Sequence, residues 1–199
     1  IDKFFNPSSV VVIGASNAQG NLGATIWRVL TRDARYPGRV YAVNRAGDDV
    51  FGAKGFSSLD AIADTIDLAV IITPAFVVPE FVRQCGEKGI SNIVIESAGF
   101  AEAGEEGRRL QREIDEAAAR YGIRLIGPNC LGTFDNHSRF CCLYGSNHLA
   151  PTSIAHPGVV SYVVQSGGIA ALLAGRLVED ISGLNKMVSL GNKADLDEA

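Results

Sequence analysis

Short apolar runs alternate with segments of helical spacing along the first two thirds of the chain. The apolar runs are rich in β-branched residues, which is typical of strands buried on both faces. They lie at 10–13, 38–43, 68–72, 92–96 and 124–126. The segments with helical spacing lie at 58–66, 77–88 and 104–120, and Gly89 ends the second of them. This alternation predicts an α/β fold with a doubly wound parallel sheet of five strands.

The pattern changes after residue 134. Residues 135–158 have no clear period and contain Pro151 and Pro157, so we expect a connecting segment there. An apolar run at 159–164, a glycine turn, a helical segment at 169–179 and a strand-like run at 186–190 follow. We therefore expect one domain at 1–134 and the beginning of a second α/β domain at 159–199. A single βαβ unit cannot cover both faces of its sheet, so we expect this second domain to be incomplete.

The first apolar run leads into a glycine-rich turn. Val10–Ile13 is followed by Gly14, Gly20 and Gly23, and a helix follows the turn. Glycines let a ligand approach the backbone closely, and the first N–H groups of the helix and its positive dipole end face the same place. The turn therefore predicts a phosphate site. Similar turns occur in Rossmann-like domains with unrelated ligands, so the turn alone does not identify the ligand.

The end of the second strand narrows the choice of ligand. Dinucleotide sites of the NAD type have an Asp or Glu about 20 residues after the glycines, where it holds the ribose hydroxyls. This chain has Asn44 and Arg45 there. An arginine suits a phosphate on the ribose, as in NADP or in the 3′-phosphorylated ADP of coenzyme A (CoA).

Other strand ends supply further candidate contacts, because ligands of open α/β sheets bind at the carboxyl ends of the strands. Thr73-Pro74 ends the third strand, Glu96-Ser97 ends the fourth, and the turn 127–130 ends the fifth. A carboxylate at the end of a buried strand is unfavourable for folding, but it can hydrogen-bond a ligand amide or amine. Glu96 is therefore either a ligand contact or a helix-capping acid.

A second glycine turn, Ser166-Gly167-Gly168, precedes the helical segment of the second domain. Backbone N–H groups at a helix N-terminus present several donors at once, so this turn predicts a second anion site. A nucleophile elbow is the weaker interpretation. That motif needs a glycine where this chain has Val164 and a histidine later in the chain, and no histidine follows Ser166.

Composition and charge narrow the function classes. The 199 residues carry a formal net charge of −4 without a basic stripe, which argues against sequence-independent nucleic-acid binding. No apolar run reaches the ~20 residues of a membrane span and no signal peptide precedes the first strand, so we expect a cytoplasmic protein. The cysteines and histidines lack metal-ligand or disulfide-framework spacing, so we expect reduced thiols and no metal. These residues are Cys85, Cys130, Cys141, Cys142, His137, His148 and His156.

Six motifs cover nearly the whole chain. They are Val10–Ser16, Asp67–Pro74, Ser97–Phe100, Gly127–Gly132, Gln165–Gly168 and Ser189–Asp195. Taken together and in this order, they resemble the NDP-forming acyl-CoA synthetases, a superfamily that includes ADP-forming acetate–CoA ligases and the succinyl-CoA synthetase alpha subunit. The resemblance implies a Rossmann-like CoA-binding domain followed by the beginning of a flavodoxin-like ligase domain.

The resemblance also implies roles for individual residues. CoA would contact the first glycine turn, the ends of the strands and the 127–130 turn, and the second glycine turn would cradle a phosphorylated histidine. The implied CoA contacts are Gly14, Ser16, Asn17, Ala18, Gln19, Gly20, Asn44, Arg45, Pro74, Glu96, Ser97, Asn129 and Cys130. The implied phosphate contacts are Ser166, Gly167 and Gly168. No catalytic residue is expected within the chain, because the family's phosphohistidine would lie beyond Ala199.

The implied reaction makes acyl-CoA from a small carboxylic acid, CoA and ATP with Mg, and it releases ADP and phosphate. An ATP-grasp domain or subunit would be the partner in a homo- or hetero-oligomer, and the chain alone would be inactive. Arg45 stands where the family commonly has proline, and Ala171 stands where succinate-specific members have tyrosine, so succinate is not favoured. Two alternatives stay open. One is a CoA-binding module without ligase chemistry, and the other is an NADP-dependent oxidoreductase, for which no catalytic Tyr-Lys or His-Asp arrangement is found.

Overall fold

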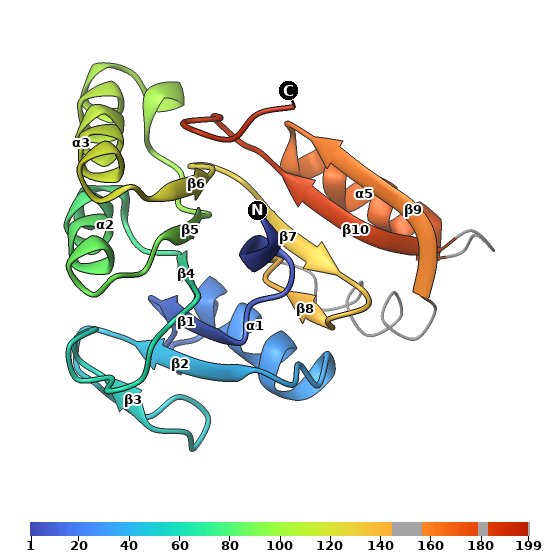
Figure 1. Cartoon of the computed structure of the whole chain (residues 1–199), viewed down its shortest axis with the longest axis horizontal. Coiled ribbons are helices and arrows are strands. Elements are labelled where there is room, and N and C mark those ends of the chain that lie inside the picture. Colours follow the sequence, from blue (N-terminus) through green and yellow to red (C-terminus); the bar gives the residue numbers. More distant parts are fainter. Residues whose placement is uncertain (145–156, 179–182, 199) are drawn as a thin grey trace.

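The computed structural model describes residues 1–144, 157–178 and 183–198, which form two sheets (Figure 1). The first is a six-stranded parallel sheet in the order β3-β2-β1-β4-β5-β6, the strand order of a Rossmann sheet. Its strands are β1 (Ser9–Ile13), β2 (Arg39–Val43), β3 (Gly55–Phe56), β4 (Leu68–Ile71), β5 (Asn92–Ile95) and β6 (Arg124–Ile126). The predicted doubly wound α/β fold is confirmed.

Helices cover both faces of this sheet (Figure 1). They are α1 (Leu22–Arg28), which continues into a π-helix (Val29–Asp33), α2 (Val78–Glu87) and α3 (Glu105–Tyr121). Alternate strand residues point to opposite faces, which is why the strands are continuous apolar runs. In β1, Val11 and Ile13 pack in the core with α2 and α3, whereas Val10 and Val12 pack in the core with α1.

The ends of the helices follow from their sequence. Pro79 lies in the first turn of α2, where its missing N–H has no helical partner to lose. α3 ends at Gly122, whose φ of 66° lies in the left-handed region that glycine adopts freely. The predicted helices at 77–88 and 104–120 are thereby confirmed, with small differences at their ends.

Two expectations about the first sheet are wrong. The sheet has a sixth strand, β3, which is too short to give a sequence pattern. Residues 58–66 form turns instead of the predicted helix. Two carbonyl groups of this segment accept bonds from outside it, since Lys88 Nζ donates to the Ile62 carbonyl at 2.6 Å and Ser9 Oγ to the Thr65 carbonyl at 3.0 Å. Leu59 and Ile62 are still buried in the core, so their apolar spacing reflects burial without a helix.

The second sheet has the order β8-β7-β10-β9, in which β7 is antiparallel to β8 and β10, and β9 is parallel to β10. Its elements are β7 (Gly132–Asp135), β8 (Phe140–Cys141), β9 (Pro157–Val164), α5 (Gly167–Val178) and β10 (Leu184–Ser189). The expected connecting segment 135–158 is therefore wrong at both ends, because β8 and the beginning of β9 lie within it. Its residues 145–156 lie outside the described part of the chain.

The residues after β10, 190–196, attach the second sheet to the first, and we call them the junction turn. The Asn192 N–H donates to the Pro128 carbonyl at 2.8 Å, and the Ala194 N–H donates to the Gly127 carbonyl at 3.0 Å. The Asp195 carboxylate accepts a bond from Arg124 Nε at 2.8 Å. Figure 1 shows this red segment running beside β6. The junction turn thus fixes β10 and β9 at the carboxyl end of β6.

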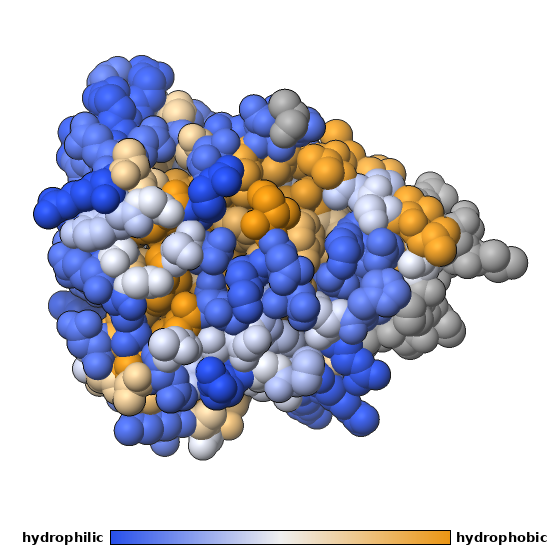
Figure 2. All heavy atoms as spheres, in the orientation of Figure 1, coloured by the Kyte–Doolittle hydropathy of each residue, from blue (hydrophilic) through white to orange (hydrophobic). Residues whose placement is uncertain are grey.

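Hydrophobic residues lie on the surface over β9 and β10 (Figure 2). β9 is an edge strand, and the exposed large hydrophobic side chains of β9 and α5 are Val159, Val163, Ile169 and Leu172. Exposed apolar area at a sheet edge is a common place for further protein to pack. Among the described residues, no helix is both long enough and apolar enough to cross a membrane.

Candidate functional site

The first glycine turn passes very close to the neighbouring strand ends. Gly14 has a φ of 107°, and a Cβ atom there would lie 2.3 Å from the Ile72 carbonyl oxygen. A Cβ on Gly23 would lie 2.8 Å from the Ala15 backbone nitrogen. Any side chain at these two positions would therefore push α1 or β4 away from β1. The beginning of α1 is held against the sheet, with its free N–H groups near the ends of β1 and β4.

Asn21 organises this turn, although sequence reasoning did not select it. Its side-chain oxygen accepts bonds from the Ala24 N–H at 2.7 Å and the Ser16 N–H at 3.2 Å, and its amide donates to the Gly14 carbonyl at 3.0 Å. Asn21 is the N-cap of α1, and asparagine directly before a helix is a signal that the sequence already contained. One side chain therefore sets the path of residues 14–24.

The predicted phosphate contacts lie at the tip of the turn. Ala18, Gln19 and Gly20 are exposed, so their backbone groups are open to a ligand. The Asn17 side chain has another role, because its amide donates to the Asp49 carbonyl at 2.9 Å and its oxygen accepts from the Phe51 N–H at 3.0 Å. Asn17 thus ties the glycine turn to the loop that follows β2. Only its backbone is left for the predicted phosphate contact.

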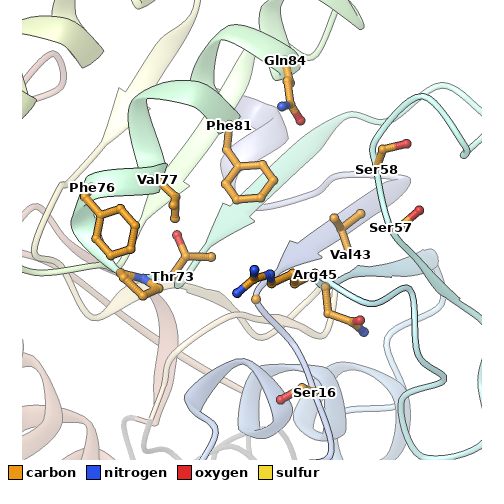
Figure 3. A pocket seen from close by; sticks show the side chains of 13 residues that line it. Ser16, Val43, Arg45, Ser57, Ser58, Thr73, Phe76, Val77, Phe81 and Gln84 are labelled. Atoms are coloured by element: carbon orange, nitrogen blue, oxygen red, sulfur yellow. The ribbon is translucent and has the colours of Figure 1, made fainter.

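A cavity of about 750 Å³ opens beside the turn, and we call it the arginine cavity. Gly14, Ser16, Asn44, Arg45 and Pro74, all predicted contacts, line it. Figure 3 shows the Arg45 side chain extending across the cavity, with the Phe81 ring on one side and Ser16 on the other. Lining residues that sequence reasoning did not select include Val43, Ser57, Ser58, Phe76, Val77, Phe81 and Gln84.

Asn44 shapes the turn that presents Arg45. The Asn44 amide donates to the Asp48 carbonyl at 2.8 Å, and its side-chain oxygen accepts from the Asp48 N–H at 3.0 Å. Such bonds from asparagine to nearby backbone stabilise tight turns. The Arg45 side chain is exposed at the cavity and takes part in none of the ion pairs between described residues. A guanidinium in this position is available to an anionic ligand.

A second cavity of about 360 Å³ lies next to the first, and we call it the glutamate cavity. It shares Thr73 and Pro74 with the arginine cavity, and Gly20, Glu96 and Ser97 also line it. Ser97 is buried, and its hydroxyl accepts a bond from the Thr73 N–H at 2.9 Å. The β4 and β5 strand ends are thereby joined at the floor of the site.

Glu96 is the most unusual group in this cavity. Its side chain is 4 % exposed, and neither carboxylate oxygen has a hydrogen-bond partner among the described residues. Burial raises the pKa of Glu96 well above its ordinary value, because a buried charge without a partner is strongly unfavourable. Glu96 caps no described helix. Burial therefore favours the neutral form of the carboxyl, and the fold leaves both of its oxygens without a hydrogen-bond partner among the described residues.

The cysteine thiols near Glu96 are unreactive. Cys130 is buried, and its Sγ donates to the Ile95 carbonyl at 3.3 Å. Burial, with a smaller effect from Glu96, raises the pKa of Cys130 well above its usual range. Burial and Glu96 act in the same way on the pKa of Cys142. A thiol needs a lowered pKa to be a nucleophile, so both cysteines act as small apolar residues, and Cys130 lines the serine cavity.

A third cavity, of about 290 Å³, brings the two predicted turns together, and we call it the serine cavity. Asn129 and Cys130 line one side, Ser166, Gly167 and Gly168 line the other, and Tyr144 is shared with the glutamate cavity. Ser166 precedes α5, and its hydroxyl lies 3.5 Å from the Ile169 N–H. The free N–H groups at the beginning of α5 therefore face the 127–130 turn.

Few groups in the described residues could hold a metal. No cluster of three or more His, Cys, Asp or Glu side chains is found in the described part of the chain. His137 lies in the turn between β7 and β8, and its N–H donates to the Asp135 carboxylate at 2.8 Å. His148 and His156 lie outside the described residues.

Comparison with known proteins gives the family. The family described as a CoA binding domain matches residues 8–135. The chain belongs to this CoA-binding family. The match covers all six strands of the first sheet, the arginine cavity, and the lining of the glutamate cavity except for Tyr144. The resemblance drawn from the six motifs is confirmed by relatives over the whole chain.

The alpha subunit of ADP-forming acetate–CoA ligase II of Pyrococcus furiosus is 38% identical over 199 residues, which are 100% of this chain and 42% of the relative. An ADP-forming 4-hydroxybutyrate–CoA ligase of Nitrosopumilus maritimus is 36% identical over 97% of this chain and 27% of its own length. The chain thus spans less than half the length of these curated relatives.

Solved structures confirm the fold. The dinucleotide-forming acetyl-coenzyme A synthetase 1 of Ca. Korarchaeum cryptofilum, in complex with phosphate and ADP, is 33% identical with a TM-score of 0.88. The alignment covers 99% of this chain and 40% of that one. PH0766 of Pyrococcus horikoshii OT3 is 39% identical with a TM-score of 0.88, over 99% of this chain and 43% of its own.

Proposed function

We propose that this chain binds CoA along the three adjoining cavities and orients it for an ADP-forming acid–CoA ligase. The observation that carries the proposal is that the cavities are adjacent and share lining residues. Thr73 and Pro74 connect the arginine cavity to the glutamate cavity, and Tyr144 connects the glutamate cavity to the serine cavity. A long ligand with a charged nucleotide at one end and an extended arm suits such a path.

The groups that line the path differ from one cavity to the next, and each set suits a different part of CoA. The N–H groups of the glycine turn suit the diphosphate, and Arg45 suits the 3′-phosphate. The adenine ring would lie against Phe76, which is 73 % exposed, and Phe81 in the arginine cavity. The neutral Glu96 carboxyl has a donor and an acceptor for a pantetheine amide. These groups therefore support CoA as the ligand of this path.

The serine cavity supports the ligase part of the proposal. Donors at the beginning of α5 would stabilise a phosphorylated histidine or an acyl phosphate, as the family resemblance implies. ATP with Mg, a small carboxylic acid, the phosphohistidine and an ATP-grasp domain or subunit would come from outside the described residues. In the last step, the CoA thiol would displace phosphate from the acyl phosphate. The chain's own contribution is to orient CoA, which lowers the entropic part of the barrier.

Titration calorimetry of the chain with CoA, dephospho-CoA and NADP tests the proposal. CoA should bind at least about tenfold more tightly than dephospho-CoA, because one charge-assisted hydrogen bond is worth about 1.5–3 kcal/mol and Arg45 is partly screened by solvent. Arg45→Ala should remove this preference, whereas Arg120→Ala, at an exposed arginine of α3, should not. NADP binding as tight as CoA binding would favour the oxidoreductase alternative and refute the proposal.

A further inference from the structure

A fourth cavity lies on the α1 side of the first sheet and is separate from the three cavities of the proposed CoA path. Its volume is about 510 Å³, which is within the range of small-molecule sites. It lies between the α1/π-helix segment and the loop after β2, and we call it the tryptophan cavity. Its lining residues are Trp27, Arg28, Thr31, Arg32, Phe51 and Ala53. None of them lines the other three cavities.

Two arginines give this cavity a local positive charge on an acidic chain. Arg28 and Arg32 are exposed, are four residues apart on the helix, and take part in none of the ion pairs between described residues. Like charges at this spacing repel each other and destabilise a helix. An anion between the two guanidiniums would remove this repulsion. Arg32 also lies in the π-helix, an element that occurs often at functional sites.

An aromatic ring stands at the opening of the cavity in a strained loop. Phe51 has a φ of 48° and is 56 % exposed. A large side chain in the left-handed region costs free energy, and such strain is concentrated at functional sites. The loop is nevertheless well fixed: Val50 and Ala53 pair through two backbone hydrogen bonds of 2.9 and 3.0 Å, and Asn17 holds the Phe51 N–H.

The ring and the charge are in contact. The Arg28 guanidinium carbon lies 5.5 Å from the centre of the Phe51 ring, and this is a cation–π arrangement. The planar guanidinium and the aromatic ring can both stack on a planar ring of a ligand. The N–H groups at the guanidinium edge can bind an anionic group of the same ligand. Thr31 adds a hydroxyl to the wall, although its hydrogen is directed to the Trp27 carbonyl at 2.8 Å.

We infer that the tryptophan cavity is a second ligand site, which binds a small anion attached to a planar ring. Nucleoside phosphates and aromatic carboxylates share this chemistry. The charged group lies between Arg28 and Arg32, and the ring lies against Phe51. The inference does not depend on CoA binding, because it uses a different cavity and different residues.

Trp27 makes the test specific, because it is the only tryptophan of the chain and it lines this cavity. Its fluorescence is followed during titration with ADP and, separately, with benzoate, inorganic phosphate and adenosine. ADP or benzoate should give a saturable change. Inorganic phosphate and adenosine should need at least about tenfold higher concentrations, since each lacks one of the two recognised groups. The ratio of the ADP affinity to the benzoate affinity shows whether the site prefers a nucleoside phosphate or an aromatic carboxylate.

The double variant Arg28→Gln/Arg32→Gln should weaken ring-anion binding at least about tenfold. Arg112→Gln/Arg120→Gln makes the same change of charge on α3 and should bind like the parent. Far-UV circular dichroism checks that both are folded, and CoA calorimetry of the first double variant should be unchanged. The inference is overturned by the absence of any saturable change with ADP and benzoate, or by equal binding in the two double variants. A signal lost in Arg45→Ala but kept in Arg28→Gln/Arg32→Gln would place the ligand in the arginine cavity and also overturn it.

Discussion

Replacing Glu96 with glutamine isolates the effect of one buried proton. The amide has nearly the shape of the neutral carboxyl and, like it, offers a donor and an acceptor, but it cannot ionise. In the unfolded chain, glutamate titrates near pH 4.3, while burial raises the pKa of Glu96 well above that value in the fold. Between the two pKa values the folded protein holds one more proton than the unfolded protein.

The sign and size of the effect follow from this single proton. The favourable contribution of the Glu96 proton to the free energy of unfolding is complete below the unfolded pKa. It is lost as the pH rises toward the folded pKa. For each pH unit in that window, the free energy of unfolding falls by about 1.4 kcal/mol in the parent relative to Glu96→Gln. The variant should therefore become progressively more stable than the parent as the pH rises from 5 toward the folded pKa.

Urea unfolding, followed by circular dichroism at pH 5, 6 and 7 without CoA, measures this difference. Asp60→Asn, which removes an exposed carboxylate, is the control and should show no comparable trend. A difference between Glu96→Gln and the parent that does not change with pH would refute the neutral carboxyl. A loss of stability in the variant at every pH would show that the carboxylate is charged and paired. Glu96→Gln should also keep CoA affinity, whereas Glu96→Leu should lose it.

Two further changes test the cap of α1 and a contact that stabilises the fold away from the site. Asn21→Ala should lower the free energy of unfolding by about 1–2 kcal/mol in urea titrations and weaken CoA binding in calorimetry, since it removes the cap of α1; unchanged stability would contradict the cap. Burial raises the pKa of Asp67, but bonds from Lys3 and Ser8 outweigh this effect and lower it. Asp67→Asn should therefore lower the free energy of unfolding most at neutral pH. The difference in free energy between variant and parent should shrink as the pH falls below the unfolded pKa of about 3.9. A difference that grows toward acid pH would refute this reasoning.

The sequence predicted those features of the fold that have a period or a local signature. Strands buried on both faces give continuous apolar runs, and the glycine turn before α1 requires glycine at positions where a Cβ has no room. The helix expected at 58–66 failed, because Leu59 and Ile62 reach the core from a segment whose carbonyl groups bond to Lys88 and Ser9. Partners from distant parts of the chain cannot be read from local spacing.

The sequence predicted which residues lie at the site. It did not predict their hydrogen-bond partners, on which the chemistry of the site depends. Glu96 was selected as a strand-end carboxylate, but only the structure shows that both of its oxygens lack partners among the described residues. Asn17 was selected as a phosphate contact, and its side chain instead holds the loop at 49–51. β7 has the sequence Gly-Thr-Phe-Asp, which is not a continuous apolar run, and β8 has only two residues. β8 pairs with β7, and the pairing of β7 with β10 joins distant parts of the chain.

The junction turn explains why two of the recognised motifs lie far apart in sequence and together in space. A Cβ on Gly191 would lie 2.2 Å from the Pro128 carbonyl oxygen, so the two turns touch through backbone atoms with no room for a side chain. Asn192 Nδ2 donates to Glu102 at 2.6 Å, which adds a contact to the loop before α3. The serine cavity has one wall from residues 129–131 and another from residues 165–168, and its position beside the glutamate cavity depends on this contact. The 127–132 and 189–195 motifs therefore act first as a rigid connection between the two sheets, and a ligand path across both sheets requires that connection.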